Sequence, residues 1–278
     1  MAKFIISAFA DEAGDSLSEQ IAALWRNGIC YIEPRTVNKQ SIIFQGDEEL
    51  GLIRRELDAA DIRVSSLGSP IGKYPIEGPF EEQLEDFRRA LYAAKLLGTN
   101  YVRIFSFLVP KERSHEYRRE VLSRLSVMLD MAEREGVTLC HENEAKTYGE
   151  QPENVRDLLT SLPRLGGILD PANYVTCNAD PLLGLEVTLP SLAYMHVKDA
   201  TRDRHVTVPP GKGDGYIAEV LTRIGERTDG TVFLTVEPHL KDYRPCVGAP
   251  AAFDSAVNSL KDVLRAIGYR ESGQHWIR

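Results

Sequence analysis

Four short apolar runs decide the fold of this chain: Thr138-Leu-Cys-His-Glu142, Gly167-Ile-Leu-Asp170, Ala193-Tyr-Met-His196 and Leu234-Thr-Val-Glu237. Each run ends in a residue whose side chain can bind a metal ion. The intervals between the runs are long enough for a helix, so each run is typical of the strand in a strand–helix unit. Burying these polar groups singly is costly, and one divalent cation would satisfy them together. We therefore interpret Glu142, Asp170, His196 and Glu237 as the ligands of one metal site.

Similar apolar runs alternate with amphipathic stretches along the whole chain. The strands that we predict are Phe4–Phe9, Tyr31–Arg35, Arg63–Gly68, Tyr101–Phe107, Thr138–Glu142, Gly167–Asp170, Ala193–Val197 and Val232–Glu237. Eight strand–helix repeats favour a closed parallel barrel over an open sheet, and such a barrel needs about 250 residues. With no linker or low-complexity segment in 278 residues, we predict an α/β fold with a single (β/α)8 TIM-barrel domain over residues 1–278. The active site of such a barrel lies at the carboxyl ends of the strands, where all four ligand candidates are placed.

Helix boundaries follow from capping residues and glycines. Residues suited to a cap or a first turn are Ser16, Asp47, Ser114 and Asp254, and glycines suited to ending a helix are Gly28, Gly98, Gly136 and Gly268. The sixth helix, around Pro181–Leu189, is short and lies between Pro181 and Pro190, so we expect a loop or a single turn there. We expect the C-terminal segment Tyr269–Arg278 either to cover a partner subunit or to fray.

Composition limits the partners and the compartment. The chain has 43% hydrophobic and 27% charged residues and a net charge of −8, which disfavours a nucleic-acid partner because phosphates are bound by Lys and Arg. Its four cysteines (Cys30, Cys140, Cys177 and Cys246) form no Cys-x-x-Cys pair, which argues against a disulfide framework and a zinc knuckle. The apolar run Phe4–Ala10 is too short for a signal peptide or a membrane span. We expect a cytoplasmic protein without a membrane partner.

The period of two along a strand sorts the neighbours of the ligands by face. Residues predicted to share a face are Glu142 with Glu144, His196 with Lys198, Glu237 with His239, and Glu33 with Arg35. By the same alternation, His141 should point away from Glu142.

Several further motifs carry a resemblance to a known family. They are Ser7-Ala-Phe-Ala-Asp-Glu12, Glu33-Pro-Arg35, Gly68-Ser-Pro-Ile-Gly-Lys73, His141-Glu-Asn-Glu144, Asp170-Pro-Ala-Asn173, His196-Val-Lys-Asp199, Pro209-Pro-Gly-Lys-Gly213 and Val236-Glu-Pro238. Over essentially its whole length, the chain resembles the sugar isomerase/epimerase superfamily of xylose isomerase-like barrels, which includes ketose 3-epimerases, inosose dehydratases and endonuclease IV. The resemblance implies one divalent metal on Glu142, Asp170, His196 and Glu237. Mixed carboxylate and imidazole ligands suit Mn²⁺, Mg²⁺, Co²⁺ or Zn²⁺, and we favour Mn²⁺.

The resemblance also implies a chemistry. In the ketose 3-epimerases one metal-bound glutamate removes a proton beside a carbonyl and the other returns one to the opposite face, roles that would fall to Glu142 and Glu237. The metal would polarise the carbonyl and hold the resulting enediolate. Candidate substrate-binding residues are Glu33, Arg35, Arg103, Asn173, Lys198, Arg202 and His239. The expected partner is a sugar or keto-sugar, with or without a phosphate, and similar proteins are commonly homodimers.

One departure from the family pattern leaves other reactions open. Many epimerases have Asp-x-x-His where this chain has Asp170-Pro-Ala-Asn173, and the amide of Asn173 carries no titrating proton near neutral pH. The same metal and base could drive β-elimination from a keto-sugar, so a dehydratase or lyase is the alternative. Endonuclease IV-type cleavage needs a histidine-rich zinc cluster, which six histidines and Asn173 do not suit. A barrel that binds a metabolite without turnover is a third possibility, which the two glutamates on one metal site argue against.

Overall fold

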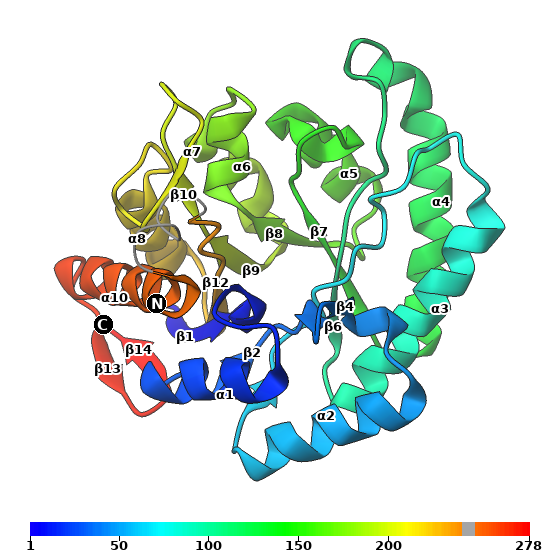
Figure 1. Ribbon diagram of the computed structural model, residues 1–278. Helices are drawn as coiled ribbons and strands as arrows, with labels where there is room; N and C mark the ends of the chain where they lie inside the picture. The colour runs from blue at the N-terminus through cyan, green and yellow to red at the C-terminus, as the bar shows by residue number, and fades with distance from the viewer. Residues whose placement is uncertain (241–247) are drawn as a thin grey trace.

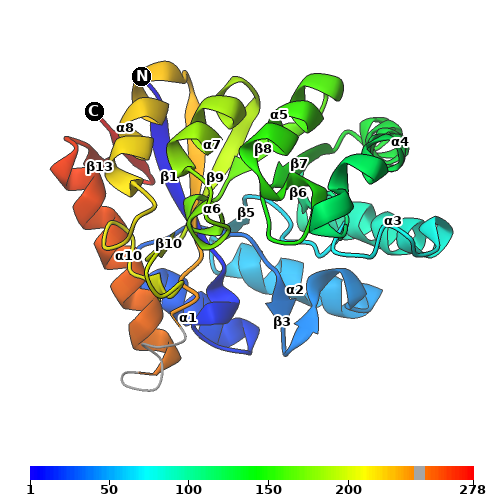
Figure 2. The same ribbon diagram turned by 90° about the horizontal axis from the view of Figure 1, so that it is seen from above.

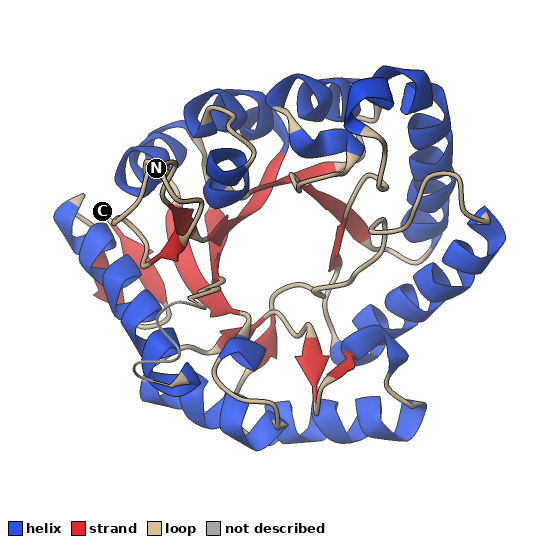
Figure 3. Ribbon diagram, turned by 45° about the horizontal axis from the view of Figure 1, so that its top comes forward, coloured by secondary structure: helices blue, strands red, loops and turns tan. Residues whose placement is uncertain are grey.

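The apolar runs form eight parallel strands that close a barrel, in the computed structural model that describes residues 1–240 and 248–278. The barrel strands are β1 (Lys3–Ala8), β2 (Tyr31–Ile32), β5 (Arg63–Val64), β6 (Tyr101–Ile104), β7 (Thr138–Glu142), β8 (Gly166–Leu169), β9 (Leu192–Val197) and β12 (Thr231–Val236). Figure 3 shows them as a ring with the helices outside. The predicted single α/β barrel is the observed architecture.

Parallel pairing runs around the ring. β1 pairs with β12 in a register from Lys3 with Thr231 to Ala8 with Val236, and β9, β8, β7 and β6 follow in order. β2 pairs with β5, Leu67 bridges to Val102 of β6, and the amide of Glu33 donates to the carbonyl of Ala8 at 3.0 Å, which closes the ring. β2 is shorter than predicted because Pro34 follows it without an N–H to donate.

Helices pack their apolar faces on the outside of this ring (Figure 1). They are α1 (Leu17–Arg26), α2 (Asp47–Ala59), α3 (Phe80–Leu97), α4 (Ser114–Arg134), α5 (Pro152–Ser161), α6 (Pro171–Thr176), α7 (Pro181–Thr188), α8 (Ile217–Arg227) and α10 (Ala249–Ala266). Ser16 caps α1 through a capping box with Glu19, as its sequence position predicts. The four predicted glycine stops all have positive φ, between 65° and 92°.

Two predictions about helices are wrong. The segment predicted as a loop or single turn is the eight-residue helix α7, because Asp180 caps it, accepting from the amide of Leu182 at 2.9 Å, and Pro181 fits the first turn. Asp254 is neither a cap nor a first-turn residue: it lies inside α10, where its carboxylate pairs with Arg26 at 3.0 Å and tethers α10 to α1.

The C-terminal segment does not fray. Strands β13 (Arg270–Ser272) and β14 (His275–Ile277) form an antiparallel hairpin, and β14 pairs with the start of β1. Trp276 is buried there. Because β14 pairs with the first strand, the two chain ends lie near each other (Figures 1 and 2).

Two antiparallel pairs of short strands lie outside the barrel sheet. β3 (Thr36–Val37) pairs with β4 (Gln40–Ser41), and β10 (Asp199–Ala200) pairs with β11 (Thr207–Val208).

Within residues 1–240 and 248–278, no helix combines the length and the apolar character needed to cross a membrane. Cys30, Cys140 and Cys177 carry free thiols, whereas Cys246 lies outside the described residues.

Candidate metal centre

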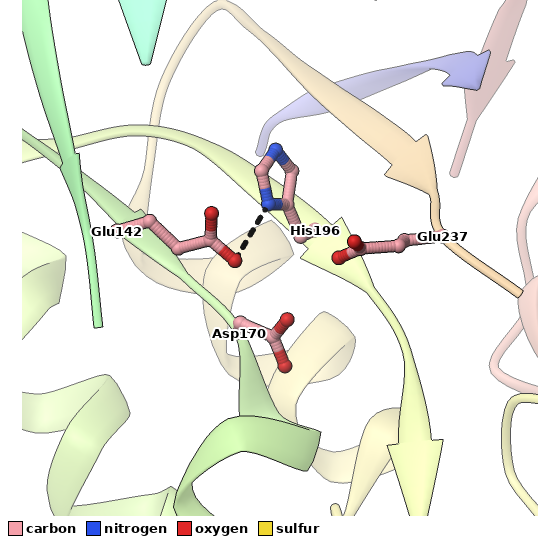
Figure 4. Close-up of side chains that lie close together, drawn as sticks. All are labelled: Glu142, Asp170, His196 and Glu237. Atoms are coloured by element: carbon pink, nitrogen blue, oxygen red, sulfur yellow. Dashed lines mark ion pairs between the residues drawn. The ribbon is translucent and has the colours of Figure 1, made fainter. Parts of the chain in front are cut away.

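The four predicted ligands meet at the carboxyl ends of four neighbouring strands. Glu142 ends β7, Asp170 follows β8, His196 lies near the end of β9 and Glu237 follows β12. One potential ligand atom from each lies within 4.8 Å of the others, and all four residues are buried. Figure 4 shows Glu142 and Glu237 pointing toward each other from opposite sides, with Asp170 and His196 between them. The four side chains therefore lie together, as the parallel barrel predicts for residues at the carboxyl ends of neighbouring strands.

Glu142 is surrounded by positive and donor groups. Its Oε1 lies 3.1 Å from Nδ1 of His196 and 3.3 Å from the amide nitrogen of Asn173, and its Oε2 lies 3.3 Å from the guanidinium of Arg103. Burial alone would raise the pKa of Glu142, but His196 and Arg103 outweigh burial and lower it to about 2. The carboxylate is therefore ionised at neutral pH.

Asp170 has the opposite tendency. Its pKa is raised to about 7, mainly by burial and further by Glu142 and Glu237, although Lys198 opposes the shift. Its Oδ1 accepts from the amide of Asn173 at 2.9 Å, which caps α6. The ammonium of Lys198 lies 2.7 Å from Oδ2.

Glu237 is held by two cationic side chains and one histidine. Its Oε1 lies 3.0 Å from Arg35 and 3.0 Å from Nε2 of His239, and its Oε2 lies 3.1 Å from Lys198. Burial would raise the pKa of Glu237, but Lys198, His239 and Arg35 lower it well below its ordinary value. Both predicted catalytic glutamates are thus charged at neutral pH.

His196 is fully buried and two aromatic rings pack against its imidazole. Phe9 and Tyr194 contact it edge-on, with ring centroids at 5.0 and 5.4 Å. Burial lowers the pKa of His196, but Glu142 and Glu33 reverse that effect and raise it to about 10. The cluster therefore has a negative potential that favours a positive charge.

The residues present fit a divalent cation. Three carboxylates and one imidazole form a mixed oxygen and nitrogen donor set suited to Mn²⁺, Mg²⁺, Co²⁺ or Zn²⁺. Oδ2 of Asp170 and Nδ1 of His196 are buried, and within the described chain neither has a hydrogen-bond partner of acceptable geometry, despite their charged neighbours. Two ligand atoms are thus available for coordination, and a cation would offset the cost of burying them.

The predicted substrate-binding residues differ in their distance from the cluster. Lys198 and Arg103 contact the ligands directly, and Arg35 and His239 contact Glu237 while staying partly exposed, at 24% and 31%. Asn173 donates to Glu142 and to the carbonyl of Asn143. Arg202 instead donates to the carbonyl of Ala179 at 2.9 Å.

Strand alternation also placed the neighbours of Glu142. His141 points away from it and lies 2.9 Å from the hydroxyl of Ser106. Glu144 forms a 2.6 Å ion pair with Lys73, whose ammonium lies over the ring of Phe105. The loop that contains Lys73 is therefore anchored beside the strand ends.

Sequence reasoning missed several residues that hold the ligands in place. Asn143 exchanges two 2.9 Å hydrogen bonds with the main chain of Asp170. Asp11 and Glu12 orient Arg35, and Glu12 also contacts His239. Asn143 follows a ligand directly in sequence, which was a usable signal, whereas the partners of Arg35 are more than 20 residues away from it.

Solved structures with the same fold have different stated activities. An IOLI protein with a bound zinc atom shares 18% identity (TM-score 0.78, covering 95% of this chain and 99% of that chain). The probable 3-DHS dehydratase AsbF of Bacillus anthracis shares 17% (TM-score 0.75, 94% and 99%). An L-ribulose 3-epimerase shares 16% (TM-score 0.68, 98% and 100%). At these identities the likeness is one of fold.

A search of curated proteins found no match. The family profile described as xylose isomerase-like TIM barrel matches residues 21–263, which is most of the chain. Together with the observed barrel, that match confirms the resemblance inferred from the motifs. The chain belongs to the family of xylose isomerase-like TIM barrels.

Proposed function

We propose that this protein is a divalent-metal-dependent isomerase or epimerase that removes a proton beside the carbonyl of a sugar or keto-sugar. The observation that carries the proposal is the opposition of Glu142 and Glu237 across one buried ligand cluster (Figure 4). Two ionised carboxylates on opposite sides of one substrate carbon could remove a proton from one face and return it to the other. When bound, the cation, for which we favour Mn²⁺, would polarise the carbonyl oxygen and stabilise developing negative charge.

The chain's own residues would supply the remaining functions. Arg35 and His239 contact Glu237 and are partly exposed, so they are placed to bind substrate hydroxyls as well. Lys198 and Arg103 are buried cations beside the ligand carboxylates, where they could donate to substrate oxygens. Burial of these groups excludes water and strengthens their electrostatic effect on the reaction.

Deuterium uptake followed by NMR tests this proposal directly. Metal-stripped and Mn²⁺-restored protein would be incubated in D₂O with a panel of ketoses, keto-sugars and their phosphates. We expect metal-dependent deuterium incorporation beside the carbonyl, with interconversion stopped in Glu142→Gln and Glu237→Gln. Glu135→Gln, an exposed carboxylate on the outside of the barrel paired with Lys95, is the matched control. Metal content measured on the same samples separates loss of a base from loss of the cation.

A departure from the epimerase pattern leaves β-elimination open as the second candidate. Asn173 stands where many epimerases have a histidine, and its amide donates to Glu142 and to the carbonyl of Asn143. It therefore supports a ligand without offering a titrating proton. In the same experiment, a dehydrated product would establish the lyase reaction, and absence of deuterium uptake at full metal occupancy would contradict both reactions for the substrates tested.

A further inference from the structure

Glu33 is a fully buried carboxylate whose oxygens are both occupied by donors of the barrel wall. Its Oε1 accepts from the hydroxyl of Tyr194 at 3.0 Å, and its Oε2 accepts from the hydroxyl of Thr235 at 2.9 Å. Nε2 of His196 lies 3.4 and 3.3 Å from the same two oxygens. The carboxylate is therefore held by side chains of β9 and β12.

These contacts place Glu33 in the layer below the predicted ligands. Tyr194 precedes His196 by two residues and Thr235 precedes Glu237 by two, so both partners lie one layer deeper on the inner face of the barrel. The hydroxyl of Tyr194 in turn lies 2.8 Å from that of Ser66. Glu33 thus lies within a buried hydrogen-bonded group, whereas a substrate would enter from the strand ends.

The two nitrogens of His196 have different surroundings. Nε2 faces Glu33, whereas Nδ1 lies 3.1 Å from Oε1 of Glu142, among the ligand atoms. Within the described residues, Nδ1 has no hydrogen-bond partner of acceptable geometry. A neutral imidazole carries one N–H, and carboxylates lie beside both of its nitrogens. The carboxylate of Glu142 is itself a predicted ligand, so with a cation bound the carboxylate of Glu33 is the one left to accept the proton, at Nε2, which leaves the lone pair of Nδ1 for coordination.

We propose that Glu33 is a positioning residue that holds His196 in the Nε2–H tautomer, with Nδ1 directed at the cation, and does not contact substrate. This inference rests on the metal site of the proposed function. A carboxylate that accepts from a metal-bound imidazole also raises the basicity of the ligand nitrogen. Tyr194 and Thr235 fix the carboxylate, and the rings of Phe9 and Tyr194 fix the plane of the imidazole.

Metal affinity without substrate tests the proposal. Co²⁺ would be titrated into metal-stripped protein and followed by its visible absorption. We expect Glu33→Gln to weaken binding about 10- to 100-fold, because loss of such a partner typically has that effect. The matched control is Asp157→Asn, which also removes a carboxylate that accepts from a tyrosine hydroxyl, that of Tyr148 at 2.7 Å, but outside the cluster. It should leave Co²⁺ affinity unchanged.

The tautomer of His196 can be measured directly, and a residue with only a structural role would not change it. In Zn²⁺-loaded protein, ¹⁵N NMR should show His196 protonated at Nε2 and metal-bound at Nδ1, and Glu33→Gln should weaken or reverse that preference. If Glu33→Gln does not fold, the double variant Tyr194→Phe/Thr235→Val keeps the carboxylate but removes its anchors. We then expect a smaller loss of affinity.

The outcomes separate this inference from the proposed reaction. Unchanged Co²⁺ affinity in Glu33→Gln, or coordination through Nε2, would overturn the positioning role even if the protein epimerises a sugar. Weakened affinity in Glu33→Gln would support it even if no sugar on the panel exchanges a proton. If the unaltered protein binds none of Co²⁺, Zn²⁺ or Mn²⁺, both proposals fall together.

Discussion

Lys198 places a positive charge between two of the predicted ligands. Its ammonium lies 2.7 Å from Oδ2 of Asp170 and 3.1 Å from Oε2 of Glu237. Burial would lower the pKa of Lys198, but these two carboxylates raise it well above its ordinary value, so it stays charged. A divalent cation bound to the same oxygens would be repelled by that ammonium. In the proposed function, Lys198 would therefore lower metal affinity while providing a cation for a substrate oxygen.

Replacing Lys198 should separate these two effects. We predict that Lys198→Met binds Mn²⁺ about tenfold more tightly, because a unit charge within 4 to 5 Å of the ion contributes about 1 kcal/mol or more of repulsion. Turnover should fall in the same variant. Competition with a chelator measures the affinity, and Lys95→Met, an exposed lysine on α3 paired with Glu135, is the control. Weaker Mn²⁺ binding in Lys198→Met would mean that Lys198 organises the ligands more than it repels the cation.

At the scale of elements, the loop between β11 and α8 is organised around one carboxylate. Asp199 accepts main-chain hydrogen bonds from Ala200, Gly211, Gly213 and Gly215, each at 2.8 or 2.9 Å. A Cβ at Gly213 would lie 2.4 Å from the carbonyl oxygen of Ala200, so the loop can approach this closely only with glycine. The cradle of amides in Pro209-Pro-Gly-Lys-Gly213 is therefore filled by the chain's own carboxylate.

We predict that Asp199→Asn loosens this loop. The amide has one acceptor oxygen in place of two, so it leaves some of the loop amides without a charged partner. The free energy of unfolding should fall by about 2 kcal/mol, within the range for hydrogen bonds to charged groups. Hydrogen exchange should speed up over residues 211–215. Asp203→Asn, whose carboxylate is exposed, should change neither, and an unchanged exchange rate in Asp199→Asn would contradict the loop-anchoring role.

At the scale of the whole molecule, the cation would join four strands of the barrel through Glu142, Asp170, His196 and Glu237. A ligand that binds only the folded state stabilises it by RT ln(1 + [L]/Kd), about 2.7 kcal/mol at a hundredfold excess over Kd. For a chain of this size we expect a rise in Tm of roughly 5 °C. Metal binding should therefore be visible in the stability of the whole barrel.

Calorimetry of chelator-treated protein, repeated with Mn²⁺, Mg²⁺, Co²⁺ and Zn²⁺, checks this prediction and ranks the metals. Glu237→Gln should reduce the shift because it weakens one ligand, whereas Glu135→Gln should retain it. A Tm that none of the four cations changes would contradict the metal site.

The sequence by itself determined the barrel and the four candidate ligands. Apolar runs and capping residues are local signals, and a parallel barrel brings the carboxyl end of every strand to one face. The meeting of Glu142, Asp170, His196 and Glu237 therefore followed from strand positions alone. The family match also confirms what the motifs suggested. The reaction, the metal and the roles of the site residues remain predictions.

Only the tertiary structure decided what surrounds those ligands. Glu33 reaches Tyr194 across 161 residues, and Arg35 reaches Glu237 across 202. Asp254, predicted as a cap or a first-turn residue, instead joins α10 to Arg26 of α1, and the hairpin that contains Trp276 pairs with β1. Such contacts depend on strand order, on depth within the barrel and on how the side chains pack across it. A period of two or 3.6 residues records which way a side chain points from its own element, but not which distant side chain it meets there.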